Sequence, residues 1–380
     1  MIGSKAVRAA FREYYFKQKL VEAPNNIEQR EFGYAQFGIP GMVRHLSFKG
    51  AGELTATLVR EVPSDVYCSN ALYRFPTLPM QEKQWQGADL IFDIDGKDLH
   101  LSCVPSHSYP ICSNCGHASP TLEKEYACPA CGGKKADYVS IPCAKCIEGS
   151  KKEAARLVEF LSGDLGIAKE NIRLYFSGNN GFHFHICDDS YRPLDSQARS
   201  DLVGYLAGVG LIAESVGVRR SPGSDLAFVK FPRSGLDYGW RKRVAETLDI
   251  GASSTIRLTN IVKEKGGYSA FKAELDRITR QMGVRIDPQV TTDVHRVFRL
   301  PGTLNSKSGL TKLRCDIARL ESFDPFADAC QLGSTKVKVK MKTHAKARLK
   351  GQTFNIAKEE AELPAFAAVY FMCKGLAEAA

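Results

Sequence analysis

The hydrophobic positions of the chain follow two different periods, and together they predict a mixed α/β protein. Apolar residues recur every three or four positions, as on one face of a helix, in residues 5–20, 151–165, 198–217 and 268–282. Other segments show the alternation or the brief apolar run of a strand: 30–34, 42–48, 65–75, 171–176 and 182–187. Residues 38–41 predict the turn between the first two strands, and residues 365–376 predict a small apolar helix.

One apolar strand ends in two acidic residues. Leu90–Phe92 is a short apolar run that predicts a buried strand, and Asp93 and Asp95 follow it. Alternate residues of a strand share a face, so the two carboxylates point the same way, with Cα atoms about 6.6 Å apart. Buried carboxylates are costly unless they are paired or bind a metal. The pattern predicts a site for two Mg²⁺ or Mn²⁺ ions, as nucleotidyl transfer requires. The alternative is an exposed strand end with an Asx turn, because Asp-x-Asp is common.

A predicted hairpin places two histidines beside a glycine-rich turn. The strands 171–176 and 182–187 flank the turn Ser177–Gly181, and His183 and His185 share one face of the second strand. Backbone N–H groups of such a turn bind anions, and Ser and His side chains add donors. The hairpin therefore predicts a triphosphate cradle, and the alternative is a hairpin whose histidines are merely exposed.

A third carboxylate lies far along the chain. Residues 284–288 resemble a strand end that carries Asp287. A helix is predicted over residues 294–300, because an N-cap signal precedes it and a proline ends it. Arg296 and Arg299 are three residues apart, so this helix would place both on one face.

Cysteine spacing predicts metal sites between the acidic strand and the next helix. Of twelve cysteines, four form the spacing of a zinc ribbon, in which four thiolates hold the ion tetrahedrally: Cys112, Cys115, Cys128 and Cys131. Cys143 and Cys146 form a third pair that needs two further ligands. The nearest candidates are Cys103 and His107, and His100 or His117 can substitute. Both sites have four protein ligands and no open position, so we expect structural Zn²⁺.

Charge and composition narrow the class of protein. The chain has 380 residues and a net charge of +10, from 52 basic and 42 acidic residues, which favours a polyanionic partner such as nucleic acid. A basic surface without such a partner is the alternative. The N-terminal residues lack the apolar core of a signal sequence, and no apolar run reaches membrane length. We therefore expect an intracellular, cytoplasmic protein with no membrane partner.

Several segments occur in an order that resembles one protein family. They are Arg30–Gly33, Arg44–Phe48, Trp85–Asp95, Ser177–His183, Asp287 and Arg296–Leu304. Over most of its length the chain resembles the catalytic small subunit of archaeal and eukaryotic-type DNA primase, and its C-terminal end resembles the archaeal branch. The resemblance implies a catalytic core of mixed β-sheets flanked by helices. Core segments 1–102, 147–191 and 284–380 would be interrupted by a zinc-binding insertion, 103–146, and a mainly helical subdomain, 192–283.

The resemblance also implies an activity. It is the template-directed synthesis of short primers from NTPs, or also dNTPs, on single-stranded DNA, in a heterodimer with a large subunit. Asp93, Asp95 and Asp287 would form the triad that binds Mg²⁺ or Mn²⁺. The set Cys103, His107, Cys143 and Cys146 would occupy the position of the family's zinc site, and the other four cysteines would be an added ribbon.

Other positions match nucleotide-binding residues of the family. Ser177 and His183 match its triphosphate-binding hairpin, and Arg299 matches a position that contacts the incoming nucleotide. Glu31 and Arg44 match positions near the active site.

The chain also departs from the family pattern. Asn179 and Asn180 stand where some relatives carry arginines, and Asn305 stands where many carry a histidine that contacts phosphate. Asparagine can donate a hydrogen bond but brings no charge. Lys307 or Arg296 can supply the missing positive charge.

Two other functions are compatible with the sequence. A repair or gap-filling polymerase of the same superfamily would extend a supplied primer without starting a strand. A non-enzymatic zinc-ribbon protein would bind nucleic acid without turning over nucleotides, but it leaves the three carboxylates unexplained. In the primase interpretation, the helical subdomain and the C-terminal helix are both candidate docking faces for the large subunit.

Overall fold

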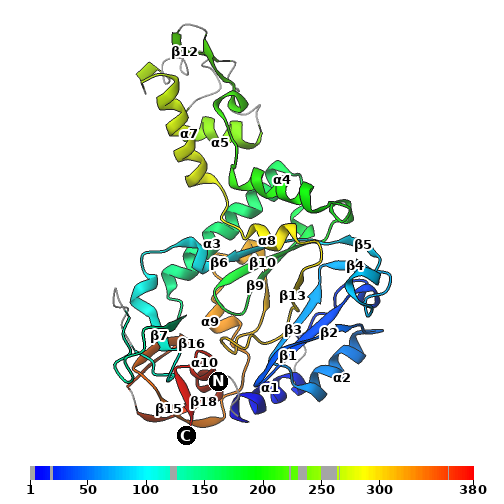
Figure 1. Cartoon of the computed structure of the whole chain (residues 1–380), viewed down its shortest axis with the longest axis vertical. Helices are drawn as coiled ribbons and strands as arrows, with labels where there is room; N and C mark the ends of the chain where they lie inside the picture. The colour runs from blue at the N-terminus through cyan, green and yellow to red at the C-terminus, as the bar shows by residue number, and fades with distance from the viewer. Residues whose placement is uncertain are drawn as a thin grey trace. The chain divides into compact units, whose positions relative to one another are not determined.

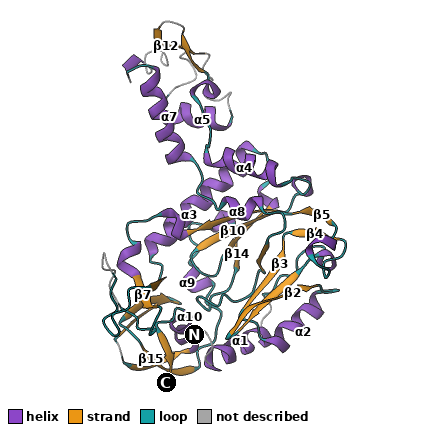
Figure 2. Ribbon diagram, viewed as in Figure 1, coloured by secondary structure: helices purple, strands orange, loops and turns teal. Residues whose placement is uncertain are grey.

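The computed structural model describes residues 5–17, 20–119, 126–221, 224–229, 238–249, 263–264, 266–357 and 359–380. The chain combines helices with several small β-sheets (Figure 2), which confirms the mixed α/β class. It forms two compact units. The first comprises Met1–Lys152, Arg173–Leu194 and Asp293–Ala380, and the second comprises Glu153–Ile172 and Asp195–Thr292.

The first unit contains a four-stranded sheet with the order β13-β3-β1-β2 (Figure 1). Its strands are β1 (Phe32–Gln36), β2 (Ile39–Leu46), β3 (Asp65–Ser69) and β13 (Val297–Arg299). Helices α1 (Lys5–Lys17) and α2 (Ala51–Glu61) each bury one apolar face. β2 begins earlier than the sequence predicted, because Gly38, with a φ of 73°, already reverses the chain.

A second sheet of the first unit carries the acidic strand. Its order is β14-β9-β10-β6, with β6 (Leu90–Asp95), β9 (Ile172–Phe176), β10 (Gly181–Ile186) and β14 (Leu313–Cys315). β6 and β10 are antiparallel, with Asp93 opposite His183 and Asp95 opposite Gly181. A Cβ atom at Gly181 would collide with the carbonyl oxygen of Ile94, so the close approach of these strands requires glycine here.

The helix predicted over residues 294–300 is wrong. Residues 297–299 form β13, which pairs with β3, and the helical turn lies earlier, as α8 (Pro288–Thr292). A helix of seven residues is marginal on its own, whereas the strand gains hydrogen bonds from β3. Arg296 therefore precedes a strand that contains Arg299, and the two residues do not share a helical face.

Two strand predictions are also corrected. Residues 284–287 are irregular rather than a strand end, because Asp287 accepts a hydrogen bond from the backbone N–H of Gln289 at 2.9 Å and leads into α8. The single strand predicted over residues 65–75 is two strands, β3 and β4 (Ala71–Tyr73), which belong to different sheets. β4 pairs with β5 (Trp85–Ala88) beside a small core of Ala71, Tyr73 and Ala88.

The remaining elements of the first unit lie in the cysteine-rich insertion and the C-terminal region. β7 (Ser108–Cys112) and β8 (Ala136–Ser140) form a hairpin, and α3 (Ala144–Glu159) follows, with residues 144–152 in the first unit and 153–159 in the second. The C-terminal strands are β15 (Lys336–Met341), β16 (Ala345–Leu349), β17 (Gln352–Ile356), β18 (Glu360–Pro364) and β19 (Ala377–Ala379). The predicted apolar helix is α10 (Ala365–Cys373), and all of its residues are buried.

The second unit is mainly helical. It contains α4 (Ser196–Ala207), α5 (Gly239–Thr247), α7 (Tyr268–Met282) and α8, with a hairpin of β11 (Val218–Ser221) and β12 (Ser224–Val229). Its core is formed by Ala213, Val216, Val218, Val244, Ala245, Phe271, Leu275 and Ile278. Within the described residues, no helix of either unit has the length and apolar character needed to cross a membrane.

Candidate active site

The acidic end of β6 faces a histidine of β10. Asp93 Oδ1 lies 3.4 Å from Nε2 of His183. Asp95, two residues on, accepts the backbone N–H of Lys97 at 3.0 Å and lies 3.1 Å from the Lys97 ammonium group. Asp95 therefore forms the Asx turn that was the alternative to a metal site, while Asp93 points towards His183 on the neighbouring strand β10.

His183 is buried and stacks on Phe298, with ring centroids 4.2 Å apart. Burial, together with the nearby charges of Lys312 and Arg299, holds the pKa of His183 well below its usual range. The imidazole is therefore neutral, with Nε2 3.4 Å from the Asp93 carboxylate, while Nδ1 has no hydrogen-bond partner among the described residues. A neutral imidazole does not cancel the charge of a neighbouring carboxylate, so Asp93 keeps its capacity to bind a cation.

Lys312 is a buried cation that sequence reasoning missed. Its ammonium group donates to Nε2 of His185 at 2.9 Å and to the carbonyl of Arg299 at 2.8 Å, and it lies over the ring of Phe298. Burial and the charge of Arg299 hold the pKa of Lys312 well below its usual range, although Asp93 opposes this effect. No signal singled this residue out, because a lone lysine beside a polar turn is normally exposed.

His185 should make the stability of the chain sensitive to acid. Burial and the charge of Lys312 hold the pKa of His185 well below 6.5, so the folded chain keeps it neutral. Below pH 6.5 the unfolded chain binds a proton that the folded chain does not, and the free energy of unfolding falls as the pH falls. Urea unfolding of wild type and His185→Gln at about pH 8 and about pH 5.5 measures this contribution.

Glutamine retains an acceptor for Lys312 but does not titrate. We expect the wild-type free energy of unfolding to fall more steeply than that of His185→Gln, by up to about 1.4 kcal/mol per pH unit. If the free energy of unfolding changed with pH equally in the two proteins, His185 would not be held neutral in the folded chain.

Arg299 is held by a carboxylate from the neighbouring strand. It donates to Asp65 at 2.6 Å and to the carbonyl of Leu304 at 3.1 Å. Asp65 also accepts the backbone N–H of Ser306 at 3.1 Å. Asp65, which the sequence did not single out, thus joins Arg299 to the polar turn that follows it.

That polar turn docks on the β9–β10 hairpin. Asn305 accepts the backbone N–H of Lys307 at 2.9 Å and donates to the carbonyl of Ser177 at 3.4 Å. Ser308 donates to the carbonyl of Gly178. A Cβ atom at Gly178, whose φ is 84°, would press against Asn305 at 3.1 Å. The two polar turns therefore form one continuous surface, on which the Lys307 side chain is exposed.

The hairpin turn is also tied to β6 and to the C-terminal region. Ser177 Oγ accepts the backbone N–H of Asn179 at 3.3 Å, and the carbonyl of Asn180 accepts the N–H of Gly96 at 2.7 Å. Asn179 Oδ1 accepts a hydrogen bond from Lys374 at 2.9 Å. The structure thus gathers the hairpin residues Ser177, Asn179 and Asn180 next to the acidic end of β6.

Glu31 lies in a buried ion network. Its carboxylate accepts from Arg44 at 2.9 Å and lies 3.4 Å from the ammonium group of Lys83. Burial would raise the pKa of Glu31, but the hydrogen bond from Arg44 and the charge of Lys83 outweigh it and lower that pKa. Glu31 therefore positions Arg44, whose side chain is 36% exposed, and is itself inaccessible to a ligand.

The site contacts described above include neither Asp287 nor the side chain of Arg296. Asp287 belongs to the second unit, so its meeting with Asp93 and Asp95 stays a prediction. Arg296 precedes β13 in the first unit, where its carbonyl accepts the N–H of Asn70 at 3.0 Å.

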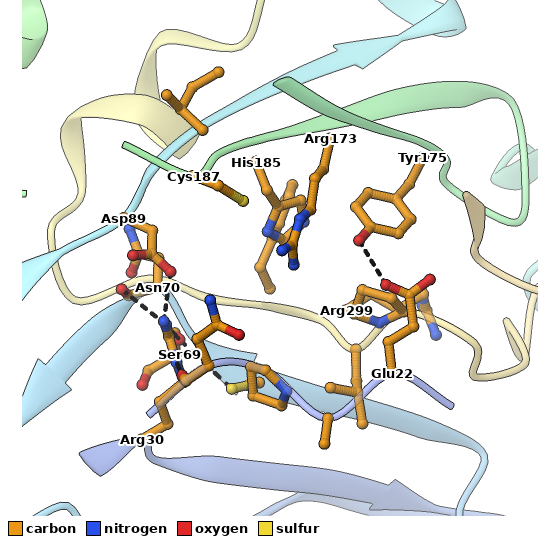
Figure 3. A pocket seen from close by; sticks show the side chains of 18 of the residues that line it. Glu22, Arg30, Ser69, Asn70, Asp89, Arg173, Tyr175, His185, Cys187 and Arg299 are labelled. Carbon is orange, nitrogen blue, oxygen red and sulfur yellow. Dashed lines mark hydrogen bonds and ion pairs between the residues drawn. The ribbon is translucent and has the colours of Figure 1, made fainter. Parts of the chain in front are cut away.

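A pocket of about 100 Å³ in the first unit is lined by charged residues from both sheets (Figure 3). Asp89 binds Arg30 at 2.6 Å and Arg192 at 2.9 Å, each through a different oxygen. Tyr175 donates to Glu22 at 2.8 Å, and the side chain of His185 also lines the pocket. These ion pairs and this hydrogen bond join the elements that line the pocket. Their structural role accounts for the charged residues found there.

The cysteine-rich insertion gathers two metal-binding groups. Cys103, His107, Cys143 and Cys146 present ligand atoms within 4.8 Å of one another, and so do Cys112, Cys115, Cys128 and Cys131. In the ribbon, Cys112 and Cys131 have sulfurs 3.6 Å apart, as have Cys115 and Cys128. These separations exclude disulfides and fit thiolates around a tetrahedral ion, since a Zn–S bond of about 2.3 Å gives sulfurs about 3.8 Å apart.

The second group includes an oriented histidine. His107 Nε2 lies 3.2 Å from the sulfur of Cys146, and Nδ1 bonds to Ser140 at 2.9 Å. Burial lowers the pKa of His107, which favours the neutral form that binds metals. A partner on the other ring nitrogen is the usual arrangement of a metal-bound histidine. Both groups can therefore hold zinc.

Comparison with known proteins gives consistent matches. The family described as DNA primase small subunit matches residues 136–317. DNA primase small subunit PriS of Cenarchaeum symbiosum is 42% identical over 378 residues, covering 98% of this chain and 97% of that protein. PriS of Nitrosopumilus maritimus is 42% identical over 377 residues, covering 98% of each. PriS of Methanococcoides burtonii is 32% identical over 417 residues, covering 98% and 97%.

Among solved structures, the polymerase domain of Mycobacterium tuberculosis ligase D in complex with DNA matches with a TM-score of 0.38 and 11% identity. The match covers 84% of this chain and 82% of that chain. A similarity this distant adds nothing to the sequence matches.

Proposed function

The chain belongs to the DNA primase small subunit family and is a nucleotidyltransferase, and from that premise we propose that it makes short primers on single-stranded DNA by two-metal catalysis. Its substrates would be NTPs, or also dNTPs. The observation that supports this most is the end of β6, where the Asp93 carboxylate lies 3.4 Å from a neutral His183 and next to a hairpin rich in hydrogen-bond donors. Hard carboxylate oxygens suit Mg²⁺ or Mn²⁺.

We assign the metal-binding role to Asp93, Asp95 and Asp287. Bound Mg²⁺ or Mn²⁺ would lower the pKa of the primer 3′-hydroxyl and stabilise the charge that develops on the leaving pyrophosphate. His183 lies 3.4 Å from Asp93 and would help to orient that carboxylate, while its stacking on Phe298 keeps the imidazole fixed.

We assign nucleotide binding to the two docked turns and the arginines near them. Ser177, Asn179 and Asn180 offer hydroxyl, amide and backbone donors, and Lys307 offers an exposed ammonium group. Arg44 is presented by Glu31, and Arg299 is presented by Asp65. We assign Asn305 a structural role, because its amide oxygen and its NH₂ group both form hydrogen bonds with backbone groups of the two turns.

Zinc at the two cysteine groups would be structural. Each group has four protein ligands, so no coordination position is left for a substrate. The insertion has little apolar core of its own, and the ions would supply its folding energy.

A large subunit is the expected partner, together with the template and the growing primer. α10 is buried within the first unit, which disfavours it as a docking face. The second unit exposes Val209, Ile212 and Tyr238, at 75%, 52% and 80% of their surface, and we propose this unit as the docking face.

One assay tests the function against its alternatives. It contains single-stranded DNA, NTPs or dNTPs, Mg²⁺ or Mn²⁺, and no primer, and the products are separated on a gel. Short products support a primase. Extension only of a supplied primer indicates a gap-filling polymerase, and binding of DNA without any product indicates a non-enzymatic protein.

A further inference from the structure

A buried lysine of the C-terminal region reaches the hairpin turn Ser177–Gly181. The turn itself carries no charged side chain. Lys374 follows α10, only 5% of it is exposed, and its ammonium group donates to Asn179 Oδ1 at 2.9 Å. A lysine almost 200 positions away along the chain thus brings a positive charge to a turn that has none of its own.

The contact fixes the direction of the Asn179 amide. An ammonium group can only donate, so the atom that faces Lys374 must be the amide oxygen. The oxygen and the NH₂ group of an amide point in different directions from the same carbon. The NH₂ group of Asn179 is therefore turned away from Lys374 and keeps its donors for another acceptor.

The charge of Lys374 has no carboxylate to compensate it. In the described part of the chain, neither Lys374 nor the neighbouring Lys307 forms an ion pair. Burial and the charge of Lys307 lower the pKa of Lys374 to about 8, although Cys373 opposes this effect. Two ammonium groups that repel each other beside a turn of anion-binding geometry are stabilised when an anion binds there.

We propose that Lys374 is a positioning residue for the triphosphate of the incoming nucleotide: it turns the NH₂ group of Asn179 toward the phosphates and supplies the positive charge that the hairpin turn lacks. This role rests on the proposed function. It lies outside the acidic strand and the hairpin motif, in a C-terminal region whose helix α10 packs on α1 and on the strands β15, β18 and β19.

The test compares variants of the full chain in nucleotide binding and primer synthesis. Lys374→Met removes the donor and the charge, and Lys374→Arg keeps both. Lys350→Met is the matched control, because Lys350 lies over the ring of Phe366, as Lys374 lies over that of Tyr370, and donates to a backbone carbonyl far from the hairpin turn in sequence. The measurements are KM and kcat for ATP, the dissociation constants of ATP and AMP, and the melting temperature.

Lys374→Met should raise KM and the dissociation constant for ATP about tenfold, which is the effect of 1.4 kcal/mol, with little change in kcat. Binding of AMP, which lacks the β- and γ-phosphates, should not change. Lys374→Arg and Lys350→Met should stay close to wild type. If Lys374→Met does not fold, Lys374→Gln replaces it in the comparison with Lys374→Arg.

The role of Lys374 is overturned if wild type binds ATP and the uncharged variant binds it equally well. It is also overturned if ATP and AMP weaken together, since that would be general damage to the site. If wild type neither binds ATP nor joins nucleotides, the proposed function is refuted, and the role of Lys374 is refuted with it.

Discussion

Asp93→Asn should reduce primer synthesis by at least about a thousandfold while the chain keeps its fold. Asparagine has the shape of aspartate, and β6 pairs with β10 through its backbone, so this pairing should persist. It lacks the negative charge that holds a divalent cation. The measurement is primer formation on single-stranded DNA with Mg²⁺ or Mn²⁺, with circular dichroism as the check on folding.

Asp98→Asn is the matched control, because Asp98 is an exposed carboxylate of the same segment that follows the strand. It should synthesise primers at close to the wild-type rate. Asp287→Asn should lose activity as completely as Asp93→Asn if the two carboxylates share the metals. Substantial synthesis by Asp93→Asn would refute the metal assignment.

Removal of zinc should unfold the cysteine-rich insertion. Structural zinc contributes about 10–16 kcal/mol in small zinc domains, far more than the few apolar contacts of a short hairpin. The native chain should contain two zinc ions, and Cys128→Ser and Cys143→Ser should each contain one fewer. Stringent chelation should lower the melting temperature and expose the insertion to proteolysis.

Cys187→Ser is the control for the zinc prediction, because Cys187 lies outside both cysteine groups. It should retain the full metal content and the wild-type melting temperature. An unchanged melting temperature after complete removal of zinc would argue that the ions do not hold the insertion together.

Several features of this protein could be predicted because they depend on neighbours in sequence. A Cys-x2-Cys pair presents two thiols to one ion whatever surrounds it, and the structure gathers the eight ligands in the two predicted groups. The strand ending at Asp95 and the hairpin of His183 also follow from local periodicity and turn residues. The predicted apolar helix appears as α10 for the same reason.

Two of the predictions that failed depend on partners far along the chain. Residues 297–299 have an ambiguous local pattern, and their state was decided by pairing with β3, more than 200 residues earlier. The strand predicted over residues 65–75 is divided because its two halves find partners in different sheets.

The sequence by itself determined the acidic strand, the hairpin and the metal-binding cysteines, because each is specified by the order and spacing of adjacent residues. Only the tertiary structure decided which charges surround them. Lys312 beside His185, Asp65 beside Arg299 and Lys374 beside Asn179 are all contacts between distant segments. Burial in that environment, and not residue type, keeps His183 neutral beside Asp93.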